Sequence, residues 1–313
     1  MLAMPGKSYR GPYRELDAEG QRRAREIKGD VMALVGAGEP RSQRSPRTLD
    51  RAASLVTEAL TEAGHTVTRL PYESEGVTVV NLEAKLEGTS RPDEIVVIGA
   101  HYDTAATGAA EAPGADDNAS GVAVMLALAR AMRPGEARNA RTVRFVAFVN
   151  EEPPWFWNPG MGSLVYAKAC KARGDRIVAM LSLETLGYYR EEPGSQKYPP
   201  VVGWFFPDRG DFVAFVGNVA SRGLVRTSVA TFRGAVAFPS EGAALPGFVT
   251  GVGWSDQWSF WEVGYPGVMV TDTAPFRNPN YHHASDRPET LDYGRLAQVT
   301  TGLVAVVKKL AND

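Results

Sequence analysis

The chain has 313 residues, of which 44% are apolar, and a formal net charge of −2. This length is sufficient to bury one large hydrophobic core or two modest ones. Because the net charge is small, no basic block occurs and no apolar run approaches the roughly 20 residues of a membrane span, we expect neither a nucleic acid nor a membrane as partner.

Helical and strand patterns alternate along the chain. The stretch 47–64 has one apolar helical stripe and ends at Gly64, a residue typical of helix ends. The stretches 65–72 and 76–88 alternate like half-buried strands. Farther on, short β-branched runs predict buried strands and longer apolar stretches predict helices. We expect strands at 93–100, 141–150, 175–184 and 265–272, and helices at 118–132, 162–174, 211–224 and 290–310.

This alternation predicts an α/β fold in which helices cover both faces of a sheet. No internal repeat or low-complexity linker divides the chain, so we expect a single domain, residues 1–313. The stretch 188–207 is rich in proline, glycine and aromatic residues and is predicted to be a long loop. Loops of that length in compact domains are usually functional, which makes this one a candidate lid.

Acidic and imidazole side chains lie where each buried strand is predicted to end. In open α/β sheets, ligands bind beyond the carboxyl ends of the strands, so these side chains would converge if the strands are parallel. They are His101 and Asp103 after the first strand, Asp116 and Asp117 before the following helix, Glu151 and Glu152 after the second strand, Glu184 at the end of the third, and His282 and His283 after the fourth.

Each motif also has an ordinary structural explanation. Helix capping alone produces DDNASG, and Glu151–Glu152 suits a solvated corner. Glu184 is harder to explain in this way, because it ends an apolar strand and acids are almost never fully buried without a partner. Jointly, the ordinary explanations weaken, since carboxylates packed together repel and their burial would raise their pKa values.

Bound cations would remove this repulsion. Two divalent ions carry as much positive charge as three carboxylates and one hydroxide carry negative charge. Imidazoles and carboxylates without a thiolate suit zinc, with cobalt and manganese as alternatives. One of the paired glutamates can then hold a metal while the other stays free as a base, and Pro153 would favour extended geometry at Glu152.

Five separated motifs resemble, in the same order, those of the co-catalytic di-zinc exopeptidases of peptidase family M28. They are GAHYDT, PGADDNASGVA, NEE, LETLGY and YHHASD. The resemblance extends from about Arg47 to the C-terminus. Members include bacterial aminopeptidases and, as fused domains, glutamate carboxypeptidases. The resemblance implies a three-layer sandwich, with a central mixed, mostly parallel sheet between helices.

The resemblance also implies a set of metal ligands. Asp117 would bridge both metals. His101 and Glu184 would complete one metal site, and Glu152 and His282 would complete the other. Glu184 stands where many members have aspartate, which is a shorter but equivalent ligand. His283, the other candidate imidazole, occupies a position that is often threonine.

The same resemblance assigns further roles. Glu151 would be the general base, which takes a proton from the bridging water and later gives one to the leaving amine. Asp103 would orient the first imidazole, and Tyr281 would steady the oxyanion. Asp256 matches a supporting acidic position. The peptide bond Asp117–Asn118 would be cis.

We therefore expect a zinc-dependent aminopeptidase with two Zn²⁺ per chain, which hydrolyses the N-terminal peptide bond of a peptide or aminoacyl-amide. One metal would also anchor the free α-amine. An apolar or aromatic N-terminal residue is the expected preference. The candidate walls of its pocket are Trp155, Phe156, Trp157, Phe248, Trp254 and Trp258.

Several alternatives remain. A glutaminyl cyclase shares the fold and several motifs but uses one zinc and releases ammonia, so metal stoichiometry distinguishes it. A carboxypeptidase needs a basic residue for the terminal carboxylate, and Arg190, Arg209 and Arg233 are candidates. A non-catalytic binding module of the same fold would usually lack ligands that are present here. VGAGEP does not indicate nucleotide binding, because it has one GxG and comes after a helical pattern.

Two features concern the compartment and assembly. Cys170 is the only cysteine, so no intrachain disulfide can form. The opening residues MLAMPGKSYRGPYRELD contain no apolar stretch of the roughly 7–15 residues found in a signal peptide. We expect a cytoplasmic protein, with secretion after trimming of an export signal as the alternative. The sequence specifies no oligomeric state.

Overall fold

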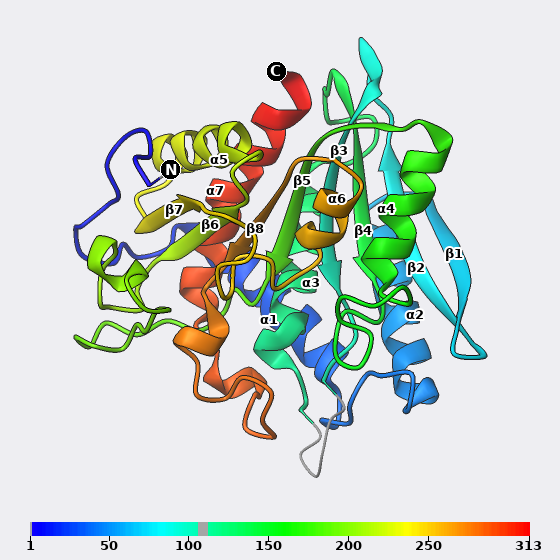
Figure 1. Ribbon diagram of the computed structural model, residues 1–313, viewed down its shortest axis with the longest axis horizontal. Helices are drawn as coiled ribbons and strands as arrows, with labels where there is room; N and C mark the ends of the chain where they lie inside the picture. The colour runs from blue at the N-terminus through cyan, green and yellow to red at the C-terminus, as the bar shows by residue number, and fades with distance from the viewer. Residues whose placement is uncertain (1, 106–111) are drawn as a thin grey trace.

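The computed structural model describes residues 2–105 and 112–313. Within this part of the chain, one sheet has the strand order β1-β2-β4-β3-β5-β8-β6-β7 (Figure 1). The strands are β1 Val67–Ser74, β2 Val77–Leu86, β3 Arg91–His101, β4 Arg141–Phe148, β5 Arg176–Glu184, β6 Val213–Gly217, β7 Ser240–Ala244 and β8 Gly267–Thr271.

The centre of the sheet is parallel. β3 runs parallel to both β4 and β5, and β5 runs parallel to β8. β2 is antiparallel to β4 and β6 is antiparallel to β8, so the sheet as a whole is mixed. The expected arrangement, with the four site-bearing strands parallel, is confirmed.

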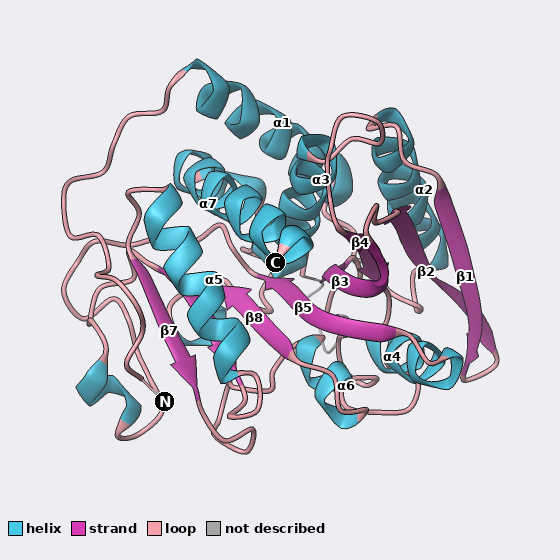
Figure 2. Ribbon diagram, turned by 90° about the horizontal axis from the view of Figure 1, so that it is seen from above, coloured by secondary structure: helices cyan, strands magenta, loops and turns pink. Residues whose placement is uncertain are grey.

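Helices cover both faces of the sheet (Figure 2). On one face, a single hydrophobic core contains α1 Ala18–Val35, α2 Pro46–Glu62, α3 Gly121–Ala131, α5 Arg222–Ala235 and α7 Tyr293–Asn312. On the other face, α4 Gly162–Arg173 and α6 Gln257–Glu262 form a second, smaller core with strands β3, β4 and β5. The predicted three-layer α/β sandwich is therefore confirmed.

The prediction of a helix at 211–224 is wrong. Residues 213–217 form β6, which pairs with β7 and β8, and α5 begins only at Arg222. The short apolar run between Asp211 and Gly217 fits a buried strand as well as a helix, and pairing with two strands decides between them. β7 and α6, of five and six residues, were too short to be predicted.

Among the described residues, no helix combines the length and the apolar character that crossing a bilayer requires. All the strands described, from β1 to β8, belong to one sheet. That the chain is a single domain stays a prediction.

We predict that Gly121 fixes the contact between α3 and β5. A Cβ atom there would lie 2.4 Å from the backbone oxygen of Leu183 and 2.3 Å from Oδ1 of Asn118. Gly121→Ala should therefore lower the free energy of unfolding by about 1–3 kcal/mol, measured by denaturant titration. The control is Gly29→Ala, since Gly29 is exposed inside α1 and its Cβ would meet nothing within 4 Å. That change should be neutral or stabilise by about 0.5–1 kcal/mol, and equal effects at both positions would contradict the prediction.

Candidate metal centre

The predicted site residues gather where parallel strands end. His101 is the last residue of β3 and lies in register with Phe148, the last residue of β4. Glu151 and Glu152 come shortly after β4, and Glu184 is the last residue of β5. β3 lies between β4 and β5 in the sheet, and the three strands run in the same direction (Figure 1). The residues at their carboxyl ends therefore come to one edge of the sheet.

Asp117 lies between two imidazoles. Its Oδ1 is 3.3 Å from Nε2 of His101, and its Oδ2 is 3.0 Å from Nε2 of His282. Oε2 of Glu184 lies 3.3 Å from the same His101 nitrogen, and Oε2 of Glu152 lies 3.2 Å from the same His282 nitrogen. Three groups of ligand atoms result, each with its atoms within 4.8 Å of one another. Asp117 belongs to two of them, with His101 and Glu184 in one and with Glu152 and His282 in the other; the third group is His101, Glu151 and Glu152.

The chemistry of these groups fits metal ions. Nδ1 and Nε2 of His101, Nε2 of His282 and Oε1 of Glu152 are buried and make no well-oriented hydrogen bond to a described residue. Buried polar atoms without partners are uncommon in folded proteins, and an ion is one explanation. Imidazole nitrogens and carboxylate oxygens without a thiolate are ligands that zinc accepts. The residues present could thus hold two cations that share one carboxylate.

Asp103 supports both the first imidazole and the tip of β4. Its Oδ1 lies 3.4 Å from Nδ1 of His101. Its two oxygens also accept the backbone N–H groups of Glu151 and Glu152, each at 3.2 Å. The same carboxylate therefore fixes His101 relative to the paired glutamates.

Asp286 holds the turn that carries Asp117. Its two oxygens accept the backbone N–H groups of Asp116 and Asp117 at 2.9 and 3.1 Å. The side chain of Asn118 ties the turn to β5 through a 2.8 Å hydrogen bond to a backbone carbonyl. The Asp117–Asn118 peptide bond is cis, as the resemblance implies. Asp286 is a supporting residue missed from the sequence, although its place in the YHHASD motif was a signal.

Burial and mutual contact set the protonation of the cluster. Burial raises the pKa of Glu152 to about 7, with repulsion from Asp117 adding to it, and raises the pKa of Glu151 well above its usual value. Burial also opposes ionisation of Asp117, but the two imidazoles outweigh it and lower the pKa of that carboxyl. For His282, burial acts to lower the pKa, but the contacts with Asp117 and Glu152 outweigh burial and raise the pKa to about 11. A metal would displace such protons, because only neutral imidazole is a ligand.

Ser255 and Asp256 approach the cluster from the loop before α6. Oγ of Ser255 donates a 2.6 Å hydrogen bond to Oε2 of Glu184. Asp256 is completely buried, and neither of its carboxylate oxygens makes a well-oriented hydrogen bond to a described residue. Burial raises the pKa of Asp256 to about 7. Asp256 belongs to none of the three ligand groups, and its supporting role stays a prediction.

The two neighbours of His282 are placed differently. The ring of Tyr281 stacks on the imidazole of His282, with 3.9 Å between ring centroids. His283 is exposed and is in none of the ligand groups found in residues 2–105 and 112–313. The structure thus brings His282, and not His283, to Asp117.

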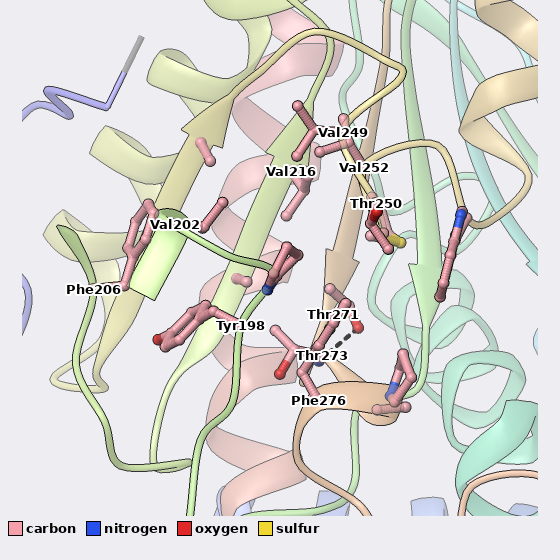
Figure 3. A pocket seen from close by; sticks show the side chains of 18 of the residues that line it. Tyr198, Val202, Phe206, Val216, Val249, Thr250, Val252, Thr271, Thr273 and Phe276 are labelled. Carbon is pink, nitrogen blue, oxygen red and sulfur yellow. Dashed lines mark hydrogen bonds between the residues drawn. The ribbon is translucent and has the colours of Figure 1, made fainter. Parts of the chain in front are cut away.

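Figure 3 shows an apolar pocket. Glu184 and Tyr281 are among the residues that line it. Its cavity volume is about 110 Å³, which is room for a side chain. Among the described residues that line it, none is lysine or arginine. Its apolar lining includes Phe206, Phe212, Val216, Leu245, Val249, Val252, Trp254, Met269 and Phe276.

The structure corrects the predicted walls of the pocket, because only Trp254 of the six aromatic candidates lines it. Trp157 stacks on Phe156 and packs against Trp258, with centroids 4.9 and 5.8 Å apart, and Phe248 is 90% exposed. The candidates outside this pocket are Trp155, Phe156, Trp157, Phe248 and Trp258.

The stretch 188–207 forms one wall of the pocket. Tyr198 and Phe206 line it from this side (Figure 3). Gln196 ties the middle of the stretch to the segment after β8, since its Oε1 accepts a 2.8 Å hydrogen bond from Nε of Arg277. The role of this stretch as a lid stays a prediction.

Comparison with known proteins agrees with the geometry. The family model described as Peptidase family M28 matches residues 81–307. The chain belongs to peptidase family M28. YfbL of Escherichia coli K12, an uncharacterized protein, is 35% identical to this M28 chain over 287 residues, which are 90% of this chain and 87% of YfbL.

Other relatives of the M28 chain carry the names of enzymes. A probable zinc metalloprotease of Pyricularia oryzae is 28% identical, over 91% of this chain and 64% of its own length. Leucine aminopeptidase 1 of Trichophyton equinum is 29% identical, over 71% of this chain and 56% of its own length. The M28 chain thus spans less than two thirds of these two relatives. Peptide hydrolysis is the property that both names share with the family description, and the name of the Pyricularia relative adds zinc.

Solved structures show the same fold. BSAP, a zinc aminopeptidase from Bacillus subtilis, has a TM-score of 0.70 and 16% identity, and the match covers 93% of this chain and 95% of that one. Fimbriiglobus ruber glutaminyl cyclase has a TM-score of 0.65 and 19% identity, with 98% and 99% covered. Because a peptidase and a cyclase share it, the fold alone does not choose between these reactions.

We predict that zinc stabilises the M28 chain through His282. Zinc at about 1,000 times its Kd should add about 4 kcal/mol to the free energy of unfolding, because the unfolded chain has no assembled site. His282→Ala should lose most of this gain and part of the zinc content, whereas His283→Ala should retain both. Thermal unfolding and metal analysis, with and without a chelator, measure these effects. An unchanged zinc content in His282→Ala would remove His282 from the site.

Proposed function

We propose that the protein is a zinc-dependent aminopeptidase whose two metal sites share Asp117. The observation that carries the proposal is the placement of the two oxygens of Asp117, each facing a different imidazole. His101 and Glu184 would complete one site, and Glu152 and His282 would complete the other. Cobalt or manganese could replace zinc in this donor set.

The balance of charge supports two ions in preference to one. Asp117, Glu152, Glu184 and the nearby Glu151 are buried together. One divalent cation would leave net negative charge in a place where burial penalises it. Two ions offset the charge of the three ligand carboxylates and a hydroxide.

Glu151 is suited to move protons. Paired zinc ions, when bound, lower the pKa of water and polarise the carbonyl of the substrate. Oε2 of Glu151 lies 3.8 Å from Nε2 of His101, beside the ligands but too far from that nitrogen for a hydrogen bond. Its position beside the ligands suits this oxygen to take a proton from the attacking water and to deliver it to the leaving amine.

Tyr281 is suited to steady the negative charge that develops on the carbonyl oxygen. Burial raises the pKa of its phenol well above the usual value, which keeps the hydroxyl protonated as a donor. Its stacking on His282 and its place in the pocket lining hold it between the metal ligands and the substrate side chain. Such a donor stabilises a transition state more than a ground state.

The pocket favours a free amino end. Where the pocket meets the cluster, Glu184 and Tyr281 line it, and no lysine or arginine is among its described lining residues. Arg190 and Arg233, two candidates for binding a carboxylate, instead contact Tyr188 and the backbone of the N-terminal segment. This arrangement supports an aminopeptidase over a carboxypeptidase, with an apolar side chain of the first residue in the pocket.

The alternative of a cyclase predicts different products and metal content. A glutaminyl cyclase would bind one zinc per chain, and would release ammonia and leave a cyclised N-terminus. The proposed peptidase would bind two and release the first amino acid. The presence of all five candidate ligands with Glu151 also supports an enzyme over a binding module.

The general-base role predicts a separation of turnover from metal binding. Glu151→Gln keeps the shape of the side chain but removes its basic oxygen, so kcat for leucine amide should fall by at least about 10²-fold. Zinc content should stay at the wild-type value. Glu152→Gln, which changes a proposed ligand, should instead lower zinc content. Near-normal turnover in Glu151→Gln would end the assignment.

The pocket predicts which substrates are cleaved. Val216 projects into it, so Val216→Phe should fill part of the space and lower kcat/KM for leucyl and phenylalanyl amides by about tenfold or more. Alanyl amide should be affected much less. Val219→Phe is the matched control, because Val219 is exposed and outside the pocket. A uniform loss on all three amides would show that the pocket does not hold the side chain of the first residue.

A further inference from the structure

Arg41 is a buried side chain that joins separate parts of the chain. It precedes the residues matched by the family model and is 1% exposed. Its Nε, Nη1 and Nη2 donate to the backbone oxygens of Tyr102, Pro113 and Gly114 at 2.9, 2.7 and 2.9 Å. The backbone of Arg41 also makes two 2.9 Å hydrogen bonds with Thr104, one to its Oγ1 and one from its N–H.

These contacts connect the segments that carry two proposed ligands. Tyr102 is the residue directly after His101, and Gly114 begins the turn that contains Asp117. Gly114 has φ of +63°, and a Cβ there would lie 2.3 Å from the backbone oxygen of Asp117. The guanidinium therefore binds the turn at a point where its backbone has little freedom, and ties that point to the end of β3.

Arg41 also brings positive charge to a group of acids. Burial lowers its pKa to about 10, and the nearby carboxylates of Asp286, Asp103, Asp117 and Glu152 each oppose that decrease. The guanidinium is thus charged at neutral pH. A fixed positive charge here reduces the mutual repulsion of these carboxylates, whether or not cations are bound.

We propose that Arg41 is a positioning residue for the metal pair: it fixes the distance between His101 and Asp117 and thereby sets the affinity of the shared site. The inference rests on the proposed two-metal function and extends it to a residue outside the motif-bearing part of the chain. It requires the geometry of arginine, because three separate nitrogens of the guanidinium donate to the three carbonyl oxygens, whereas lysine offers a single nitrogen.

The test compares zinc affinity in Arg41→Met, Arg41→Lys and wild type, by competition with a chromogenic chelator. Arg41→Met should bind zinc about 10–100-fold more weakly, and Arg41→Lys should recover part of the loss by retaining the charge. The absorption spectrum of the cobalt-substituted protein should also change, since it reports the geometry of the ligands. Far-UV circular dichroism establishes that each variant is folded.

Arg144→Met is the matched control. Arg144 is also buried and its Nη1 lies 2.7 Å from Asp175, but it contacts none of the metal ligands among the described residues. Its loss should lower stability and leave zinc affinity and the cobalt spectrum unchanged.

Three outcomes would overturn the inference. The first is a folded Arg41→Met with wild-type zinc affinity and cobalt spectrum. The second is an equal loss of affinity in Arg144→Met. The third applies if Arg41→Met does not fold: it is wild-type zinc affinity in Arg41→Lys. A wild-type protein that binds no zinc would instead refute the proposed function itself, so the two failures are distinguishable.

Discussion

The structure depends on the compensation of charge around Asp117. This carboxylate is buried and faces one imidazole with each oxygen, while Glu184 approaches the first imidazole and Glu152 the second. Acids in such proximity repel and resist burial, so the arrangement needs positive charge. Imidazolium provides it when the site holds protons, and divalent cations would provide it in the proposed enzyme. The membership of the chain in a family with zinc-named relatives agrees with the second case.

The surrounding fold converts this constraint into geometry. Parallel strands place His101, the paired glutamates and Glu184 at one edge of the sheet. Backbone-directed carboxylates then fix the loops, with Asp103 holding the tip of β4 and Asp286 holding the turn around Asp117. Hydrogen bonds to backbone groups are well suited to this task, because they restrain the chain without taking up the oxygens of the ligands.

The proposed specificity pocket belongs to a different part of the molecule. The pocket beside the cluster is built mainly by β6, β7, β8 and the connecting segments, whereas most of the cluster comes from the ends of β3, β4 and β5. In the proposed enzyme, chemistry and selectivity would therefore depend on separate residues, as is common where loops and edge strands are placed on a rigid sheet. Tyr281 connects the two parts, since it stacks on His282 and also lines the pocket.

The sequence by itself determined the α/β class, the parallel central strands and the residues that meet at their ends. Those features are local, because a buried strand is a short β-branched run and its terminal side chains are neighbours of that run in the chain. Only the tertiary structure decided that 213–217 is a strand, that Trp254 alone of six aromatic candidates faces the pocket, and that Asp286 and Arg41 hold the turn of Asp117. Each of these depends on partners distant in sequence, and the spacing of residues along one chain carries no record of which side chains will meet across the fold.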